Sequence, residues 1–207
     1  LNKNKNKNCK KLIFGRDEVQ RYYLNWKGKW VNYSKDIIDK KRKEYAGFGK
    51  QEYFELPKLV VRRTGDFILA NVDYDKFYFS NNIFVCSAKK SNHLDLKYIL
   101  GILNSKLITW YYRTIQPRKG KLFAELKINV LNDIPVADVD FTNPSQKSFH
   151  NKMVKLVDEM LSAKKELVNV KTDKDKLYYQ RKCDEINKEI DDLVFQLYDV
   201  KEITITQ

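Results

Sequence analysis

The sequence has few of the residues that build cross-linked or metal-stabilised proteins. Its 207 residues include three cysteines, Cys9, Cys86 and Cys183, which are odd in number and far apart. This pattern predicts neither a disulfide framework nor a zinc site, so a reducing cytoplasm is the expected compartment. The two histidines, His93 and His150, have no partner at metal-ligand spacing, and we predict no metal site.

Long apolar runs are also missing. No segment approaches the roughly 20 apolar residues of a membrane-spanning helix, so no membrane partner is expected. Asn and Lys alternate over residues 2–8 without an apolar stretch behind them, which excludes a signal peptide. Because such a segment buries nothing, residues 1–10 are predicted to be a disordered basic tail. The chain does not begin with Met, and we interpret it as a fragment of a longer protein.

Positive charge is in excess, and the excess is regional. The net charge is +13. Residues 1–145 contain 28 Lys and Arg against 15 Asp and Glu, whereas residues 146–207 contain 12 of each. A diffuse surplus would indicate solubility alone, but a regional surplus indicates a polyanionic partner.

The pattern of residues 11–143 predicts a mostly antiparallel sheet with packed helices. A short helical stretch is expected around residues 17–22, and Lys27-Gly28 is a plausible hairpin turn between aromatic-rich strands. Residues 36–45 are charged, and we interpret them as a solvated helix. Two strands are expected to pair around Thr64-Gly65-Asp66, and two more to continue an antiparallel meander. These four strands cover residues 59–63, 67–72, 76–80 and 83–86.

Helical periodicity dominates the second half of the chain. Residues 94–112 are predicted to form one helix, because their apolar side chains recur at three- and four-residue spacing. Ser91 or Asn92 could cap its start. A closing strand is then expected from Leu126, Ile128, Val130 and Ile134.

Two further amphipathic segments follow a linker that contains Pro144, and they predict an antiparallel helical hairpin with its turn at residues 172–175. The expected fold class is therefore α+β. Residues 11–143 form the first domain, residues 144–200 the hairpin and residues 201–207 a tail.

A basic loop follows the predicted helix of residues 94–112. Residues 113–121 read RTIQPRKGK and carry four cations between two packed segments. Such a loop can enter a groove of DNA, although an ordinary solvated loop is the alternative. Arg can bond guanine through two donors, and Gln pairs with adenine. The predicted base contacts are Gln116 and Arg118, and the predicted phosphate contacts are Arg113, Lys119 and Lys121.

Arg62 and Arg63 are two further candidates for DNA binding. They end a predicted strand beside a Gly-Asp turn, and neighbouring strand residues point to opposite faces. Either arginine contacts DNA or forms an ion pair with Asp66 or Glu55.

Five segments, in this order, resemble a known family. They are Leu12–Asp17 with Arg21-Tyr22, Leu56–Arg62, Tyr98–Leu107, Asp133–Val136 and Asp191–Asp199. Over about residues 11–200 the chain resembles the TaqI-like C-terminal specificity domain of type IIG restriction–modification enzymes and DNA adenine methyltransferases. One departure is Val136-Ala137, where the family usually has a second proline after Ile-Pro.

The resemblance implies that residues 11–143 are a target-recognition domain and residues 144–200 a helical spacer. In such enzymes a separate domain binds S-adenosylmethionine and methylates a flipped adenine. The methyltransferase signature Asn-Pro-Pro-Tyr is missing here, because the Asn143-Pro144 pair is followed by Ser145. We therefore expect double-stranded DNA and a missing catalytic domain of the same chain as partners. No cofactor and no catalytic residue are expected in this part.

Three alternatives remain open. Glu125-Leu126-Lys127 has the spacing of a nuclease motif, but no Pro-Asp pair precedes it. The chain could instead be a stand-alone subunit like the specificity subunits of type I systems, which bind catalytic partners through helices. It could also be an RNA-binding module that uses exposed aromatic residues. Core packing is the favoured interpretation for those aromatics, which are Tyr22, Tyr23, Trp26, Trp30 and Tyr33.

Overall fold

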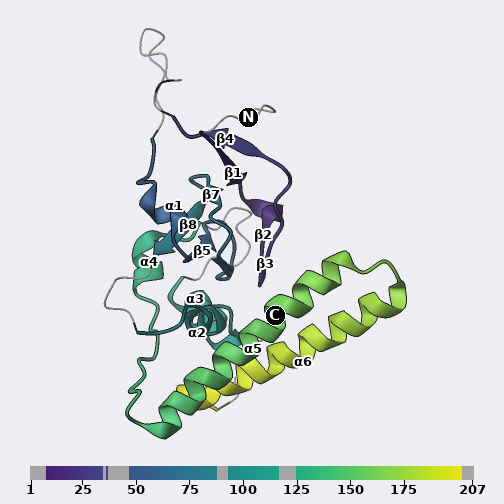
Figure 1. The fold of residues 1–207 in the computed structure, drawn as a ribbon. Coiled ribbons are helices and arrows are strands. Elements are labelled where there is room, and N and C mark those ends of the chain that lie inside the picture. The colour runs from purple at the N-terminus through teal and green to yellow at the C-terminus, as the bar shows by residue number, and fades with distance from the viewer. Residues whose placement is uncertain (1–7, 35, 37–46, 88–92, 117–124, 202–207) are drawn as a thin grey trace.

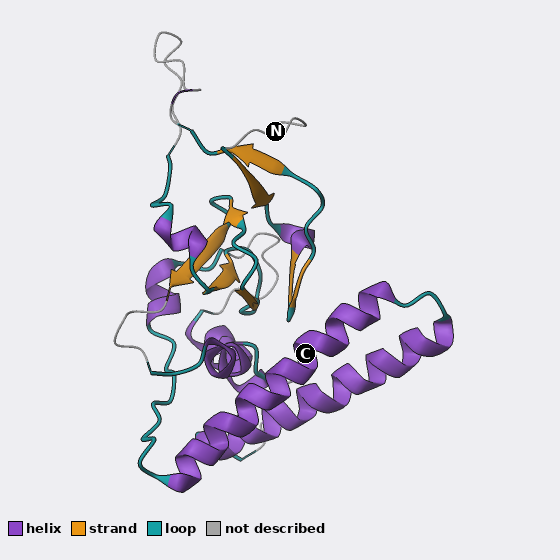
Figure 2. Cartoon of the chain, in the orientation of Figure 1, coloured by secondary structure: helices purple, strands orange, loops and turns teal. Residues whose placement is uncertain are grey.

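The computed structural model of the chain describes residues 8–34, 36, 47–87, 93–116 and 125–201 (Figure 1). The strands gather in one part of the molecule, and the two longest helices lie together along one side of it (Figure 2). Antiparallel strand pairings predominate among the described residues, and two C-terminal helices follow them. This architecture confirms the predicted α+β class.

The central sheet has the strand order β6-β5-β8. Both neighbours pair with β5 in antiparallel orientation, with Val61 opposite Ala70 and Arg62 opposite Ile83. The predicted pairing around residues 64–66 is therefore confirmed. The bounds of the strands are Lys58–Arg62 for β5, Ala70–Asp73 for β6 and Ile83–Ser87 for β8.

The predicted meander is wrong in its order, because the chain leaves the sheet after β6. The Asp73 carboxylate accepts hydrogen bonds from the backbone N–H groups of Asp75 and Phe77 and so holds a tight turn. The next strand, β7 (Tyr78–Phe79), then pairs in parallel with β1 (Cys9–Ile13). Asp73 also forms a fully buried ion pair with Lys58, at 2.5 Å, which closes this end of the central sheet.

A second sheet has the order β4-β1-β7, with β4 at Trp30–Asn32. The predicted hairpin around Lys27-Gly28 is wrong, because β4 pairs with β1 and not with the preceding strand. That preceding strand is β3 (Tyr23–Leu24), which pairs with β2 (Val19–Gln20) across a turn where Tyr22 has φ 62°. The helical stretch expected at residues 17–22 is only the short 3-10 turn η1 (Arg16–Glu18).

Strand β1 begins inside the segment that the sequence predicts to be disordered. Cys9 and Lys10 belong to this strand, and the Lys10 ammonium lies 2.9 Å from Glu55 Oε1. Glu55 ends the short helix α1 (Glu52–Glu55). The prediction of disorder is therefore wrong for these two residues, while residues 1–7 lie outside the described part. The helix predicted over residues 36–45 also lies outside it, apart from Asp36.

The predicted helix of residues 94–112 is two helices. Helix α2 (Leu96–Leu103) ends at Asn104, and α3 (Lys106–Ile115) begins after Ser105. The N-cap of α2 is Asp95, whose side chain accepts a hydrogen bond from the Lys97 N–H at 2.7 Å. The proposed caps Ser91 and Asn92 lie outside the described residues. The apolar period continues across the break, which explains why the pattern alone predicts one helix.

The predicted closing strand is also wrong. Residues 128–132 form helix α4 (Ile128–Asn132), and only a single bridge between Glu125 and Thr64 is strand-like there. Val130 is buried, but Ile128 is 51% exposed, so the apolar residues follow a helical period and not an alternating one.

The helical hairpin is confirmed. It consists of α5 (Pro144–Asn169) and α6 (Asp173–Leu197). Asn143 and Thr172 cap the two helices through their side chains, and residues 173–175 form the first turn of α6. The hairpin packs on α2, and its connecting end extends away from the sheets (Figure 1). No helix among the described residues is long and apolar enough to cross a membrane.

One hydrophobic core runs from the central sheet through α2 to the hairpin. It includes Val61 of β5, Ile102 of α2 and Ile190 of α6. Gly101 allows α5 to approach α2 closely, because a Cβ at this position would run into the thioether of Met153 and lie 3.1 Å from Val157.

The variant Gly101→Ala is expected to lower the free energy of unfolding by about 1–3 kcal/mol. Alanine favours a helix by about 1 kcal/mol over glycine, but the added methyl group would overlap with the buried side chain of Met153. Urea unfolding followed by circular dichroism measures the change. Met153→Ala makes room, so the double variant should lose less stability than the sum of the single losses. A stabilised Gly101→Ala variant would contradict the close α2–α5 contact.

Candidate nucleic-acid interface

Most of the described candidate residues gather at one end of the central sheet. At this end β5 finishes at Arg62, β6 begins at Ala70 and β8 begins at Ile83. The turns of residues 63–69 and 80–82 therefore lie here, and the last turn of α3 and Glu125 contact them. We call this region, residues 62–69, 80–82, 113–116 and 125, the turn end.

Arg113 joins the last turn of α3 to the turn of residues 63–69. Its Nη2 atom lies 2.9 Å from Asp66 Oδ2, and its Nε donates to the Asp66 carbonyl oxygen at 3.3 Å. The Arg113 and Asp66 side chains are 38% and 56% exposed. An ion pair this exposed contributes at most about 1 kcal/mol.

Arg63 makes a second link, to Glu125. Its Nη2 pairs with Glu125 Oε1, and its Nη1 donates to the Asn81 carbonyl oxygen at 3.0 Å. The backbone adds two hydrogen bonds, from the Arg63 N–H to Asn82 and from the Leu126 N–H to Arg63. The ion-pair partner of Arg63 is thus Glu125 and not Asp66 or Glu55, because antiparallel bridging brings Glu125 beside this turn.

Arg62 is half-buried and folds over its own turn. Its Nε donates to the Thr64 carbonyl oxygen at 2.7 Å. Gly65 has φ +151°, and a Cβ there would lie 3.2 Å from Arg62 Nη2. Glycine is therefore favoured at this position by the backbone conformation, and a side chain there would also make the guanidinium shift slightly.

Gln116 ends α3, where its backbone N–H donates to the Tyr112 carbonyl oxygen at 2.9 Å and its side chain is half-buried. The remaining candidates, Arg118, Lys119 and Lys121, lie outside the described residues. The segment that carries them starts after Gln116 and ends before Glu125, so the two ion pairs of the turn end lie on either side of it.

Asn104 and Ser105 set the direction of α3. The Asn104 side chain, which is fully buried, accepts a hydrogen bond from the Ala70 N–H at 3.0 Å and donates one to the Ala70 carbonyl oxygen at 3.1 Å. The Ser105 hydroxyl accepts from the Ile108 N–H and caps the helix. The helix start is thereby fixed to the first residue of β6.

Asp191 of α6 fixes the same point from the other side. Its Oδ1 accepts a hydrogen bond from the Lys106 N–H at 2.8 Å, and its Oδ2 lies 3.7 Å from the Lys106 ammonium. A carboxylate is favourable at a helix N-terminus because the first N–H groups lack partners there. Burial raises the pKa of Asp191, and the Lys106 N–H acts in the opposite direction. The segments Tyr98–Leu107 and Asp191–Asp199 both belong to the resemblance described above. Only the fold shows that they contact each other.

The candidate stacking aromatics are mostly engaged inside the protein. Tyr22 is 2% exposed, and burial raises the pKa of its hydroxyl to about 12, so it stays protonated. Trp26 and Trp30 pack edge to face with ring centroids 5.3 Å apart. Tyr33 makes similar contacts with Phe48, Phe54 and Tyr78. These contacts agree with the core-packing interpretation and leave the RNA-binding alternative without support from these four residues.

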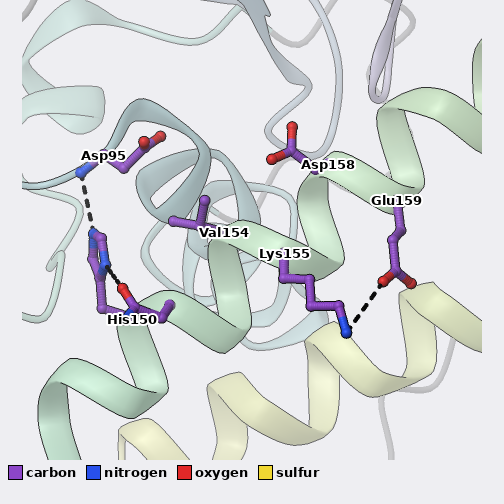
Figure 3. A pocket seen from close by; sticks show the side chains of 7 residues that line it. Asp95, His150, Val154, Lys155, Asp158 and Glu159 are labelled. Atoms are coloured by element: carbon purple, nitrogen blue, oxygen red, sulfur yellow. Dashed lines mark hydrogen bonds and ion pairs between the residues drawn. The ribbon is translucent and has the colours of Figure 1, made fainter. Parts of the chain in front are cut away.

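A hollow between the start of α2 and α5 is the other polar site (Figure 3). His150 accepts a hydrogen bond from the Asp95 N–H through Nε2, so its Nδ1 carries the proton and faces Asn151. Asp158 pairs with Lys97, and Glu159 pairs with Lys155. Within the described ranges, no group of three His, Cys, Asp or Glu side chains could hold a metal ion.

Comparison with known proteins identifies the family. Residues 10–136 match the model of the TaqI-like C-terminal specificity domain. The match covers more than half of the chain, and the chain belongs to this family. Membership implies DNA binding and target recognition in restriction–modification enzymes. No curated protein matched the chain.

The variant Asn104→Ala tests the link between α3 and the sheet. It is expected to lower the free energy of unfolding by about 2 kcal/mol or more, because it leaves the buried N–H and C=O of Ala70 without partners. Thermal and urea unfolding measure the loss. The matched control is Asn132→Ala, at an exposed position of α4, which should stay within about 0.5 kcal/mol of the wild type. Equal effects of the two variants would contradict the role of Asn104.

Proposed function

We propose that this chain reads a specific duplex DNA sequence for a bacterial restriction–modification enzyme that methylates adenine. The observation that carries the proposal is the pair of anchors at the turn end. Arg113 precedes residues 117–124 in the sequence and pairs with Asp66, and Glu125 follows them and pairs with Arg63. Residues 117–124 include Arg118, Lys119 and Lys121. A basic segment anchored at both ends has less conformational freedom to lose when it enters a groove.

The anchors suggest a division of roles among the candidates. Arg63 and Arg113 position the segment, since acidic side chains and backbone carbonyls already occupy their guanidinium groups. Gln116 and Arg118 contact base edges, and Lys119 and Lys121 neutralise phosphates. Arg62 shapes the turn of residues 63–69, next to which the DNA backbone would pass.

Catalysis belongs to another part of the parent enzyme in this proposal. A methyltransferase domain of the same chain would bind S-adenosylmethionine and act on the flipped adenine. Type II cleavage, where present, would also reside in that missing part.

A second candidate function is that of a stand-alone specificity subunit that binds catalytic partners through its helices. It is favoured by apolar side chains near the connecting end of the hairpin. Val168, Leu177 and Tyr178 are 50%, 53% and 59% exposed there. Light scattering of the purified chain, alone and with a separately produced catalytic subunit, distinguishes this candidate from a domain of a single-chain enzyme.

Selection from a random-sequence duplex pool is expected to enrich one motif, and binding should weaken steeply with salt because counterions are released. Arg118→Ala should relax preference at one base position and cost about 1–3 kcal/mol on the enriched duplex. Lys119→Ala should weaken all duplexes alike and reduce the salt slope by about 1. Single-stranded RNA should not compete effectively. A uniform loss in both variants would exclude Arg118 as a base contact.

The variant Asp66→Asn distinguishes an anchoring role of Asp66 from a simple effect of its negative charge on DNA binding. It removes a negative charge from a DNA-facing surface, so charge alone predicts tighter binding to every duplex. If Asp66 anchors Arg113, the variant should instead bind the enriched duplex about fivefold more weakly. Without the anchor, the basic segment loses more conformational entropy when it binds DNA. The matched control is Asp75→Asn, which removes an exposed charge at the other end of β6. Fluorescence anisotropy measures both, and equal tightening in the two variants would refute the anchor.

A further inference from the structure

Phe14 is a large aromatic side chain that the fold holds in solvent. It directly follows β1 and is 51% exposed. Its backbone is fixed on both sides, because its N–H donates to Glu18 Oε2 at 2.7 Å and its carbonyl oxygen accepts a hydrogen bond from the Ser80 hydroxyl. The exposure of the ring is therefore set by the folded backbone and does not arise from a frayed strand end.

The neighbours of Phe14 reinforce this conformation. Gly15 has φ +135°, and a Cβ there would lie 3.3 Å from Asn82 Cβ, so a side chain would be strained. The Glu18 side chain is 3% exposed, accepts from the N–H groups of Phe14 and Gly15, and lies 3.3 Å from the Lys29 ammonium. A buried carboxylate with three partners makes a rigid support for one exposed ring.

Phe14 lies next to the turn of residues 80–82, which is part of the turn end. The parallel pairing of β1 with β7 places Ile13 opposite Phe79, which brings Phe14 to Ser80. The turn of residues 80–82 also accepts the Arg63 guanidinium through Asn81 and the Arg63 N–H through Asn82. Phe14 and Arg63 therefore both contact the turn of residues 80–82.

The ring also has a cation beside it. The Lys29 ammonium lies 5.6 Å from the centroid of the Phe14 ring. Cations can hold phosphates, whereas an apolar ring gains nothing from a phosphate and gains by stacking on, or wedging between, bases. The combination of a rigid exposed ring and a neighbouring cation suits a polyanion that also has flat apolar groups, as the bases of DNA are.

We propose that Phe14 contacts a base of the target duplex with its aromatic ring and so adds a salt-independent contribution to recognition. This inference rests on the proposed function, since it places the same DNA across the turn end. Electrostatic contacts to phosphates weaken with salt, but a ring stacked on a base does not. Phe14 would thus be a determinant of affinity distinct from the basic segment.

The test compares variants of the 207-residue chain on the duplex enriched from the random pool, with affinity measured by fluorescence anisotropy at several salt concentrations. Phe14→Ala should weaken binding about tenfold and leave the salt slope unchanged. Phe14→Tyr keeps the ring and should bind within about twofold of the wild type. Phe14→Leu keeps apolar bulk without a ring and should lose most of the tenfold.

The chain contains a matched control for an exposed ring beside a lysine. Tyr74 is 49% exposed, and the Lys97 ammonium lies 5.8 Å from its ring centroid. It follows β6 at the end of the sheet opposite to the turn end. Tyr74→Ala should leave affinity unchanged, and an equal loss in Tyr74→Ala and Phe14→Ala would overturn the inference.

A second measurement guards against misfolded variants. The enriched duplex is labelled with 2-aminopurine at each adenine position in turn. Binding of the wild type should change the fluorescence at one of these positions. Binding of Phe14→Leu should leave the fluorescence at that position unchanged. Full binding by Phe14→Ala would overturn the inference while the proposed function stands. Failure of the wild type to enrich or bind any duplex would overturn the proposed function itself, and the inference with it.

Discussion

The buried junction between α2 and α3 is the interaction on which the rest of the structure depends. Asn104 hydrogen-bonds the backbone of Ala70 in β6, Ser105 caps α3, and Asp191 of α6 accepts the first N–H of that helix. Sheet, helix and hairpin therefore meet at one set of hydrogen bonds that water does not reach. A buried partner left unpaired is costly, so the direction of α3 is strongly determined.

The direction of α3 in turn determines where the candidate site is formed. The helix delivers Arg113 to Asp66, while the turn of residues 63–69 receives Glu125 through Arg63. These ion pairs are exposed and individually weak, unlike the junction at the other end of the helix. The buried junction therefore fixes the start of α3, and the exposed ion pairs at its other end position the turn end for DNA, which is the partner that the specificity-domain family implies.

Sequence patterns predicted the helical hairpin and the β5–β6 pair, but they failed for two other strand pairings and where side chains compete with the backbone. The two hairpin helices follow an apolar period because one side of each helix is exposed to solvent. Strands β5 and β6 are instead nearly continuously buried and pair across a turn that contains glycine. The helix predicted over residues 94–112 fails because Asn104 and Ser105 take up backbone hydrogen bonds, although the apolar period runs on. The predicted closing strand fails for another reason, because Leu126, Val130 and Ile134 are buried at four-residue spacing, which fits a helix, while Ile128 is exposed.

The sequence alone determined the fold class, the regional positive charge, the helical hairpin and the order of segments that marks the family. These are properties of composition or of neighbours within a few residues. Only the tertiary structure decided that Arg63 meets Glu125, that Asp191 holds α3 and that the ring of Phe14 stays in solvent. Arg63 and Glu125 are 62 positions apart in the sequence, and Lys106 and Asp191 are 85 positions apart. No local period specifies such partners, because they follow from how whole elements pack.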